Sequence, residues 1–546
     1  MKRFFRLAAA AAVVLSVFLP MAALAAGGAA LVSTEMITRG VKLEQWTYPT
    51  SAGTARVSVI EVDLKDPYIK VDALIGKDGK TGNKQSVMNM AKEAGAVAAI
   101  NGDFFTLNAE GAPFGVTVQS GEMVTSPGYI GAKNAFQIDT SNEPFIGRMD
   151  FNAQVIAADG ASFQLFGVNK TQYNVGYGGF TGKSHYDRLH MYTSRWNVKN
   201  WVGDSLGAPY TVVVVKNGVV TDILRNQTVQ QIPDDTYLLL AHGAAEVWVN
   251  QHIRVGDTLK VNMMLYPIRD LFSAVDGSTL LLKDGQKTPI SYEIKGNLAR
   301  TAVGYSSDKR FMYMVTVEKS SSSSGMTLDQ LAGFLQFIGV SDAVNLDGGG
   351  STTMVARKLG TFELKEAIKP AYGSERAVPN GLGVFTTAPK GKLKNVEIAV
   401  SATTILAGET VTVKIASAYD EYFNPVSISG MDIDWDRTDG VDITKDKGVS
   451  SLKFDSPGDY YLTCNIEGIR KSVTVHVVGE DDIAKLELDK SHIQLFPGES
   501  VTLKPTITFK NGTKRAVLPQ LLEWELEGVE GQVTSNGTLS ALKVSE

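Results

Sequence analysis

The chain is poor in cysteine and histidine, and this limits the chemistry that it can carry. Cys464 is the one cysteine among 546 residues, so an internal disulfide and a thiolate metal centre are both excluded. Six histidines occur without an H-E-x-x-H pattern, which makes a zinc hydrolase a weak interpretation. The 44% apolar and 20% charged content is that of an ordinary globular protein.

Only one long apolar run is present, and it is typical of a secretory leader. Lys2, Arg3 and Arg6 precede an apolar stretch at 7–19, and Ala-Leu-Ala at 23–25 has the form of a cleavage site. The run is too short for a stable membrane anchor, and no other apolar run of spanning length follows. We predict a signal peptide at 1–26 and a secreted or cell-surface chain, without a membrane span, of bacterial type.

The formal net charge is −5, and removal of the basic leader makes the mature chain more acidic. A chain with this charge is not expected to bind nucleic acid through its overall field.

Residues 341–353, SDAVNLDGGGSTT, hold the clearest chemical pattern. An apolar run ends at Asp347, and three glycines, 348–350, follow it. Three successive glycines cost backbone entropy, which a chain accepts where φ is positive or where another group must approach closely. Amides in such a turn can bind an anion, and Asp347 can serve as acid, base or nucleophile. The alternative is a plain turn capped by the aspartate, and no P-loop or dinucleotide pattern is present in this stretch.

The residues before this loop favour a buried, rigid setting for Asp347. Residues 326–339 have the apolar spacing of a helix, with a capping box formed by Thr327 and Gln330 and a terminating Gly339. A helix, a buried strand and an acidic loop place Asp347 at the carboxyl end of a strand, where ligand sites of α/β sheets lie.

Polar groups also follow other predicted strands. A run at 96–100 ends at Asn101 and Asp103, Arg300 directly precedes a strand, and Glu318 ends another. Each has a structural alternative: Asn-Gly is a turn signal, and an arginine near an acidic loop is commonly a surface ion pair. Arg300 is alternatively a guanidinium that binds a phosphate through two donors.

Residues 169–195 interleave tyrosine, glycine, histidine and arginine with few aliphatic side chains. We expect a long surface loop here that lines a cleft and contacts sugars, or a mobile loop without a role.

The composition changes near Pro389, after which alternating strands follow without a helix pattern. ILAGETVTVK at 405–414 matches LFPGESVTLK at 495–504, and such a repeat suggests tandem β-sandwich modules. We therefore predict a catalytic domain at 27–389, one module at 392–479 and a second, incomplete one at 483–546.

Four blocks resemble the phosphodiester glycosidase family: AAINGDFF at 98–105, RTAVGYSSD at 300–308, residues 325–354, and SERAVPNGLGVF at 374–385. The resemblance covers about residues 29–389. The repeats after it resemble bacterial immunoglobulin-like modules. The resulting fold class is α+β, a mixed β-sheet domain with packed helices, followed by all-β sandwiches.

The resemblance implies a hydrolase that cleaves sugar-1-phosphodiesters, of the N-acetylglucosamine-1-phosphodiester type, in cell-surface or extracellular glycans. The implied catalytic residues are Asp347, Asp103 and Glu318, although Lys319 follows Glu318 where the family commonly has glycine. The implied residues for substrate or phosphate binding are Asn101, Arg300, Gly348, Gly349, Gly350, Ser351, Thr352, Arg376 and Asn380.

Other interpretations stay open at this stage. One is a catalytically inactive protein that binds glycans or the cell wall, because folds and motifs outlive activity. Another is a divalent-cation site at Asp103 and Asp347, although the ligand spacing of a known site is absent. We expect no cofactor beyond such a cation, and a phosphodiester-linked glycan as the partner.

Overall fold

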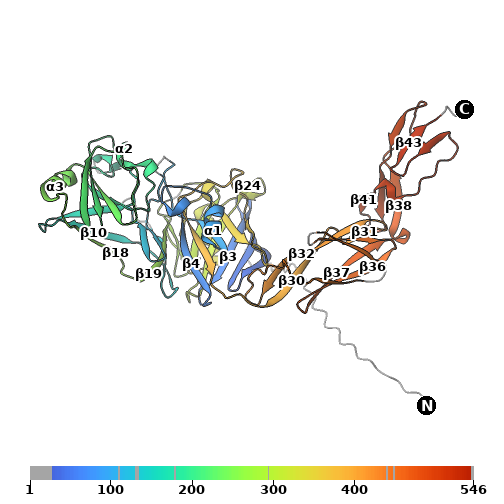
Figure 1. Cartoon of the computed structure of the whole chain (residues 1–546), viewed down its shortest axis with the longest axis horizontal. Helices are drawn as coiled ribbons and strands as arrows, with labels where there is room; N and C mark the ends of the chain where they lie inside the picture. The colour runs from blue at the N-terminus through green and yellow to red at the C-terminus, as the bar shows by residue number, and fades with distance from the viewer. Residues whose placement is uncertain are drawn as a thin grey trace, which may run out of the picture. The chain divides into compact units, whose positions relative to one another are not determined.

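The computed structural model describes residues 28–107, 111–128, 134–177, 180–292, 294–437, 441–446 and 449–542. The chain divides into two compact units, residues 1–358 with 362–389, and residues 359–361 with 390–546 (Figure 1). The predicted leader lies outside the described residues. Within them, no helix has the length and apolar character that a membrane crossing requires.

Strands make up 48% of the structure and helices 9%. The predicted α+β class is therefore right about the abundance of sheet and overstates the helical part.

Two sheets face each other in the first unit and carry the candidate site. One has the order β1-β2-β3-β23-β22-β26-β20-β21 and the other β28-β27-β5-β29-β4. The strands of the first are β1 (Ala30–Thr38), β2 (Val41–Thr50), β3 (Gly53–Asp63), β23 (Phe311–Val317), β22 (Arg300–Tyr305), β26 (Asp342–Asn345), β20 (Leu280–Lys283) and β21 (Gln286–Lys287). Those of the second are β28 (Leu364–Glu366), β27 (Met354–Arg357), β5 (Ala98–Asn101), β29 (Asn380–Thr386) and β4 (Ile69–Ile75).

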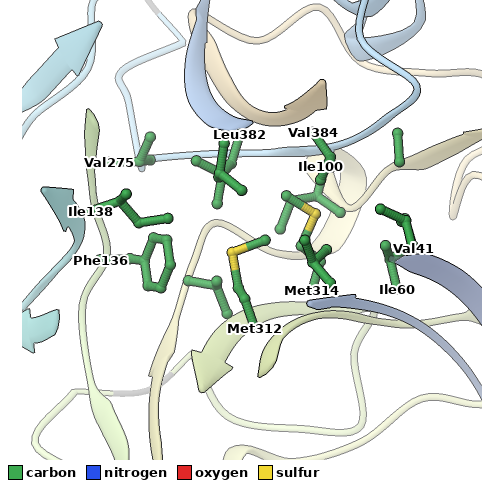
Figure 2. Close-up of a cluster of buried hydrophobic side chains, with 14 of the residues drawn as sticks. Val41, Ile60, Ile100, Phe136, Ile138, Val275, Met312, Met314, Leu382 and Val384 are labelled. Carbon is green, nitrogen blue, oxygen red and sulfur yellow. The ribbon is translucent and has the colours of Figure 1, made fainter. Parts of the chain in front are cut away.

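The inner faces of these sheets share one apolar core, drawn in Figure 2. Ile100 of β5 and Leu382 of β29 contribute from one sheet, and Met312 of β23 and Val344 of β26 contribute from the other. Alternate residues of a strand face opposite sides of its sheet, so Ala99 and Ala343 belong to separate clusters on the outer faces.

Helices cover both outer faces, so the layers are helix, sheet, sheet, helix. Helix α4 (Leu328–Phe337) packs Leu331, Phe334 and Leu335 onto the first sheet. Helix α1 (Val87–Ala94) packs Met90 and Ala91 onto the second sheet. The structure confirms the helix predicted at 326–339 and the predicted capping box of Thr327 and Gln330.

The strand before Asp347 does not lie in a parallel sheet. β26 pairs antiparallel with both β20 and β22, so the rule for open α/β sheets does not explain the position of Asp347. The position of Asp347 follows instead from the two facing sheets, because the ends of β26 and β5 meet at one edge.

Two larger sheets and two two-stranded sheets, β12 (Asn174–Tyr177) with β13 (Phe180–Lys183) and β24 (Lys319–Ser320) with β25 (Ser323–Ser324), make up the rest of the first unit. One of the larger sheets has five strands, β7 (Glu122–Thr125), β6 (Thr117–Gln119), β19 (Leu271–Asp276), β8 (Ala135–Asp139) and β9 (Pro144–Gly147). The other has seven, β16 (Val219–Arg225), β15 (Thr211–Lys216), β17 (Thr236–Ala241), β14 (Leu189–Tyr192), β11 (Ser162–Val168), β10 (Asp150–Ile156) and β18 (Lys260–Tyr266). Helices α2 (Val202–Leu206) and α3 (Ala244–His252) lie in this part of the chain.

The segment at 169–195 is not a surface loop throughout, contrary to the prediction. Lys170, His185, His190 and Tyr192 are all at most 3% exposed. β14, which contains His190 and Tyr192, pairs with β11 and β17 in the seven-stranded sheet. The aromatic and basic side chains of this segment are therefore partly core residues.

The second unit is built of strands only, apart from short 3₁₀ turns, in the residues that the structure describes. Its first part has sheets β30-β32-β35-β34 and β31-β37-β36-β33, and its second has β38-β40-β41 and β39-β43-β42. Val413, Phe454, Leu462 and Val475, from both sheets of the first part, share a core. The bounds are β30 (Leu393–Val400), β31 (Thr404–Leu406), β32 (Thr410–Asp420), β33 (Asp434–Arg437), β34 (Val441–Asp446), β35 (Val449–Phe454), β36 (Gly458–Ile466), β37 (Ile469–Val478), β38 (Ile483–Leu488), β39 (Ser500–Thr502), β40 (Pro505–Phe509), β41 (Lys514–Ala516), β42 (Gly531–Val533) and β43 (Thr538–Ala541).

The sequence repeat forms the same turn twice. Gly408 and Gly498 have φ of 83° and 88°, a region that only glycine occupies readily. Glu409 accepts from the amide of Leu406 at 2.9 Å, and Glu499 accepts from that of Phe496 at 3.0 Å.

Helix α4 provides a test of the local contribution to stability. We expect Thr327→Ala to lower the free energy of unfolding by about 1 kcal/mol, because it removes the acceptor for the amide of Gln330. Urea unfolding measures this change. Thr327→Ser, which keeps the hydroxyl, is the control, and an equal loss in both variants would contradict the capping role.

Candidate active site

Asn101 joins the two facing sheets at the site. It ends β5 and is fully buried. Its Nδ2 donates to the backbone oxygen of Asp347 at 2.7 Å. Its Oδ1 accepts from Thr301 Oγ1 at 2.8 Å and from the amide of Thr353 at 3.1 Å. Both polar ends of this side chain bind protein groups, so Asn101 positions the loop of Asp347, and a substrate contact by Asn101 stays a prediction.

Asp103 lies beside this junction and is 1% exposed. Its amide donates to Asn380 Oδ1 at 2.9 Å, and its Oδ2 accepts from the amide of Gly115 at 2.5 Å. The amide of Asp347 donates to the oxygen of Gly102 at 3.0 Å. These bonds bring the two predicted catalytic aspartates, which are far apart in sequence, to one place.

Asp347 is partly exposed at this place, and its carboxylate has defined partners. Gly348 donates its amide to Asp347 Oδ1 at 2.9 Å, and the Ser351 hydroxyl also binds the carboxylate. Loss of hydration raises the pKa of Asp347 to about 6, against the lowering effects of Ser351, the Gly348 amide and Arg376, while Asp103 adds to the rise. An acid with this pKa exchanges protons near neutral pH.

Two of the three glycine amides predicted to bind a phosphate already donate to protein groups. The amide of Gly348 binds the Asp347 carboxylate, and the amide of Gly349 donates to the oxygen of Ala299 at 2.8 Å. Gly349 has a φ of 60°, in the left-handed region that residues with a side chain rarely adopt, so a glycine is required at this position. At Gly350, a Cβ would lie 2.4 Å from Arg376 Nη2, so the glycine admits the guanidinium. The glycines therefore shape the loop around Asp347 and Arg376.

Arg376 is the arginine of the site. It is partly buried, and its Nη1 donates to Ser351 Oγ at 3.3 Å. Its charge lowers the pKa of Asp347. A guanidinium that binds a hydroxyl, packs against a glycine loop and acts electrostatically on a nearby carboxylate is well placed to bind a phosphate.

The Arg300 guanidinium donates to backbone oxygens. Its Nε donates to the oxygen of Met326, and its Nη2 donates to those of Ile294 and Gly296, each at 2.9 Å. A guanidinium engaged in this way holds backbone segments together, and bidentate phosphate binding by Arg300 stays a prediction.

Glu318 and Asn380 also bind protein groups. Glu318 accepts from Ser320 Oγ at 2.5 Å and from the amide of Lys369 at 3.3 Å, so it fixes the turn after β23, and its catalytic role stays a prediction. Asn380 accepts from the amide of Asp103 and donates to Thr117 Oγ1 at 2.9 Å, so it supports Asp103, and its contact with substrate stays a prediction.

The hydroxyls of the loop point inward. Ser351 is fully buried and lies between Arg376 and Asp347. Thr352 is 1% exposed, and its Oγ1 accepts from Thr301 at 3.3 Å. Ser351 therefore lowers the pKa of Asp347 through its hydrogen bond. Thr352 belongs to the hydrogen-bonded junction between the two sheets.

Two site neighbours are missing from the sequence prediction. Gly115 donates to Asp103, and a Cβ on it would lie 1.6 Å from Asp276 Oδ2. Asp276, 4% exposed, ends β19 and is followed by glycine, as Asp347 is. This Asp-Gly pattern after a strand, shared with Asp347, is the signal by which Asp276 could have been identified from the sequence.

A cavity of about 280 Å³ borders Asp276 and Val116. Arg148, Asp150, Gln164 and Phe166 also line it, which combines hydrogen-bonding groups with an aromatic ring. Within the described parts of the chain, no group of three or more His, Cys, Asp or Glu side chains is arranged to hold a metal ion.

Residues 210–385 match the model of the phosphodiester glycosidase family, which confirms the resemblance over that range. AAINGDFF at 98–105 lies outside it. No curated protein sequence matches the chain.

Solved structures resemble the fold. A Burkholderia pseudomallei protein thought to be exported is 17% identical, with a TM-score of 0.53 over 65% of this chain and 96% of its own. A hypothetical protein from Synechocystis is 22% identical, with a TM-score of 0.50 over 64% of this chain, and the match spans 62% of that protein's length. The catalytic domain of zebrafish N-acetylglucosamine-1-phosphodiester alpha-N-acetylglucosaminidase is 14% identical, over 64% of this chain and 84% of that domain. Its TM-score of 0.33 is too low to support an argument.

Asp347 should reduce stability at neutral pH. A carboxyl whose pKa is higher in the folded than in the unfolded chain binds more protons when folded, so stability falls as pH rises from about 4 to about 6. Asp347→Asn removes this penalty. We expect the variant to unfold like the wild type at pH 4 and to exceed its stability by on the order of 1 kcal/mol at pH 7.5.

Urea unfolding across pH measures this difference. Asn in place of the exposed Asp284 is the control, and a variant less stable than the wild type at pH 7.5 would contradict the assigned burial cost.

Proposed function

We propose that the first unit hydrolyses sugar-1-phosphodiesters, releasing a free sugar and a phosphomonoester. The family match over residues 210–385 supports a glycosidase that acts on phosphodiesters. The observation that carries the proposal is the meeting of Asp103 and Asp347 beside Arg376, with the pKa of Asp347 near neutrality. The substrate type, N-acetylglucosamine-1-phosphodiester, rests on the resemblance.

The geometry suggests a division of labour between the two carboxylates. Asp103, which accepts from the amide of Gly115 at 2.5 Å, is the carboxylate that stabilises positive charge at the anomeric carbon. Asp347, with its pKa raised to about 6, takes the proton of the attacking water. Two carboxylates in unlike surroundings commonly divide their roles in this way.

Arg376 binds the phosphate in this scheme. It is the guanidinium that contacts the loop of Asp347, and it neutralises charge on the departing phosphomonoester. The cavity beside Asp276 has room for a sugar ring, with Gln164 and Asp150 available for hydroxyl groups.

The wider setting of the reaction is part of the proposal. The leader-like N-terminus and the likeness to a protein thought to be exported support secretion. We propose that residues 392–479 and 483–546 are immunoglobulin-like modules that contact a cell wall or polysaccharide, and that the natural substrate is a surface or extracellular glycan. A catalytically inactive glycan-binding protein is the rival, and the raised pKa of Asp347 favours an enzyme.

Asp347→Asn should abolish most of the activity while leaving the fold intact. Loss of a general base is expected to lower kcat by roughly 10²- to 10⁴-fold. In the wild type, kcat should rise with pH through about 6 as Asp347 ionises, and the variant should lose this dependence. Release of phosphomonoester from an N-acetylglucosamine-1-phosphodiester measures both. A variant with near-normal kcat and the wild-type pH profile would refute the assignment.

The two arginines give a matched pair of variants. Arg376→Lys keeps the charge and loses the planar fork, so kcat/KM should fall roughly 10- to 100-fold, the value of a hydrogen bond to a charged group. Arg300→Lys should lower the melting temperature, because it loses bonds to three carbonyl oxygens, and leave kcat/KM of the folded protein within a few-fold. The reverse pattern would return phosphate binding to Arg300.

A further inference from the structure

Lys170 is a buried lysine that the proposed reaction leaves without a role. It is 3% exposed. Its Nζ donates to the backbone oxygens of Phe114 at 2.6 Å, Ser126 at 2.7 Å and Gly115 at 3.0 Å. A buried ammonium is costly unless it is well bonded, so these carbonyl oxygens must be held in place for Lys170 to stay charged.

One of these carbonyls belongs to the peptide group that binds Asp103. The Phe114–Gly115 peptide accepts from Lys170 through its oxygen at 2.6 Å and donates to Asp103 Oδ2 through its N–H at 2.5 Å. In a trans peptide the C=O and N–H point in opposite directions, so Lys170 and Asp103 lie on opposite sides of one amide. Asp276 packs against the Cα of Gly115, which leaves no room for a side chain there.

We propose that Lys170 is a positioning residue that acts on Asp103 through the Phe114–Gly115 peptide. Its charge polarises the carbonyl, the polarised amide is a stronger donor, and Asp103 is thereby held in its ionised form. Hydrogen bonds in series strengthen one another in this way inside a protein. The inference rests on the proposed function only in calling Asp103 catalytic; the contact and its electrostatic effect do not depend on the reaction.

The groups around Lys170 are basic or neutral. His185 and His190 stack with ring centroids 3.6 Å apart, and burial lowers the pKa of His185 to about 3 and that of His190 well below its ordinary value. Tyr192 donates to the oxygen of Lys170 at 2.8 Å. Arg188, from the same segment, also disfavours the charged histidines. Both rings are therefore neutral, and Lys170 supplies the positive charge that reaches the peptide.

The groups around Asp103 are of both signs. Asp347 interacts with it electrostatically, and Asp276 contacts the same glycine. Arg376 lowers the pKa of Asp347 through its charge. Lys84 lies over the ring of Phe105, which is two residues from Asp103 in the sequence. A test of the inference must therefore observe the Phe114–Gly115 peptide itself.

The sequence makes this observation practical. Phe-Gly occurs only at 114–115 and 166–167, so the full chain labelled with carbonyl-¹³C phenylalanine and ¹⁵N glycine gives two carbonyl–amide correlations in NMR. One reports the Phe114 carbonyl that Lys170 contacts and the Gly115 amide that Asp103 accepts from. The other, at Gly167, lies against the Lys170 side chain and reports local disturbance.

Three variants separate electrostatics from structure. Lys170→Gln keeps donors and loses the charge, Lys170→Arg keeps the charge, and Tyr192→Phe removes a hydroxyl from the same buried cluster. The Gly115 amide should titrate with Asp103, and Asp103→Asn should abolish that titration. We expect the midpoint to move to higher pH by about half a unit or more in Lys170→Gln, and to stay within a few tenths in Lys170→Arg and Tyr192→Phe. An unchanged midpoint in Lys170→Gln overturns the proposal.

If Lys170→Gln does not fold, a titration of the wild-type protein tests the proposal. Protonation of Asp103 should then move the Phe114 carbonyl resonance together with the Gly115 amide, while Gly167 stays fixed. A Phe114 carbonyl that does not move while Gly115 titrates overturns the proposal. Since neither measurement uses substrate, a failure of the proposed hydrolysis would leave both results standing, and the loss of kcat in Lys170→Gln tests the catalytic consequence separately.

Discussion

The hydrogen bonds of the Asn101 side chain are the constraint on which the site depends. Asn101 ends a strand of one sheet and donates to the loop of Asp347, which follows a strand of the facing sheet. Its oxygen also accepts from Thr301 of β22 and from the amide of Thr353, which directly precedes β27. A buried amide with all of these partners is rigid. It therefore fixes the separation of the two sheets at the place where Asp103 and Asp347 meet. The bond from the amide of Asp347 to the oxygen of Gly102 strengthens the same junction.

The electrostatics of the site follow from unequal surroundings. Asp347 has lost much of its hydration, and its partners offset this only in part, so its pKa lies near 6. Asp103 accepts from an amide whose carbonyl binds a buried ammonium. The same fold therefore places one carboxyl where its pKa lies near neutrality, and gives the other a backbone amide as a close hydrogen-bond donor. That contrast is what a glycosidase of two carboxylates requires.

Sequence patterns located the site more reliably than they assigned its roles. The helix at 328–337, the strand at 342–345 and the two acidic motifs were predictable, because apolar periodicity and glycine runs are local signals. The contacts of Arg300 were not, because the partner of a guanidinium depends on which carbonyl oxygens distant segments bring to it. Lys170 was missed for the same reason, since a polar and aromatic stretch indicates exposure and its burial is decided by the pairing of β14.

The central claim, that the protein is a glycosidase acting on a phosphodiester, is tested most directly by the oxygen source of the phosphate product. The wild-type chain is incubated with an N-acetylglucosamine-1-phosphodiester in ¹⁸O-labelled water, and the mass of the released phosphomonoester is measured by mass spectrometry. Attack of water at the anomeric carbon leaves every phosphate oxygen in place, so we predict an unlabelled phosphomonoester. A phosphomonoester that carries ¹⁸O, which requires attack at phosphorus, or the absence of turnover would contradict the account.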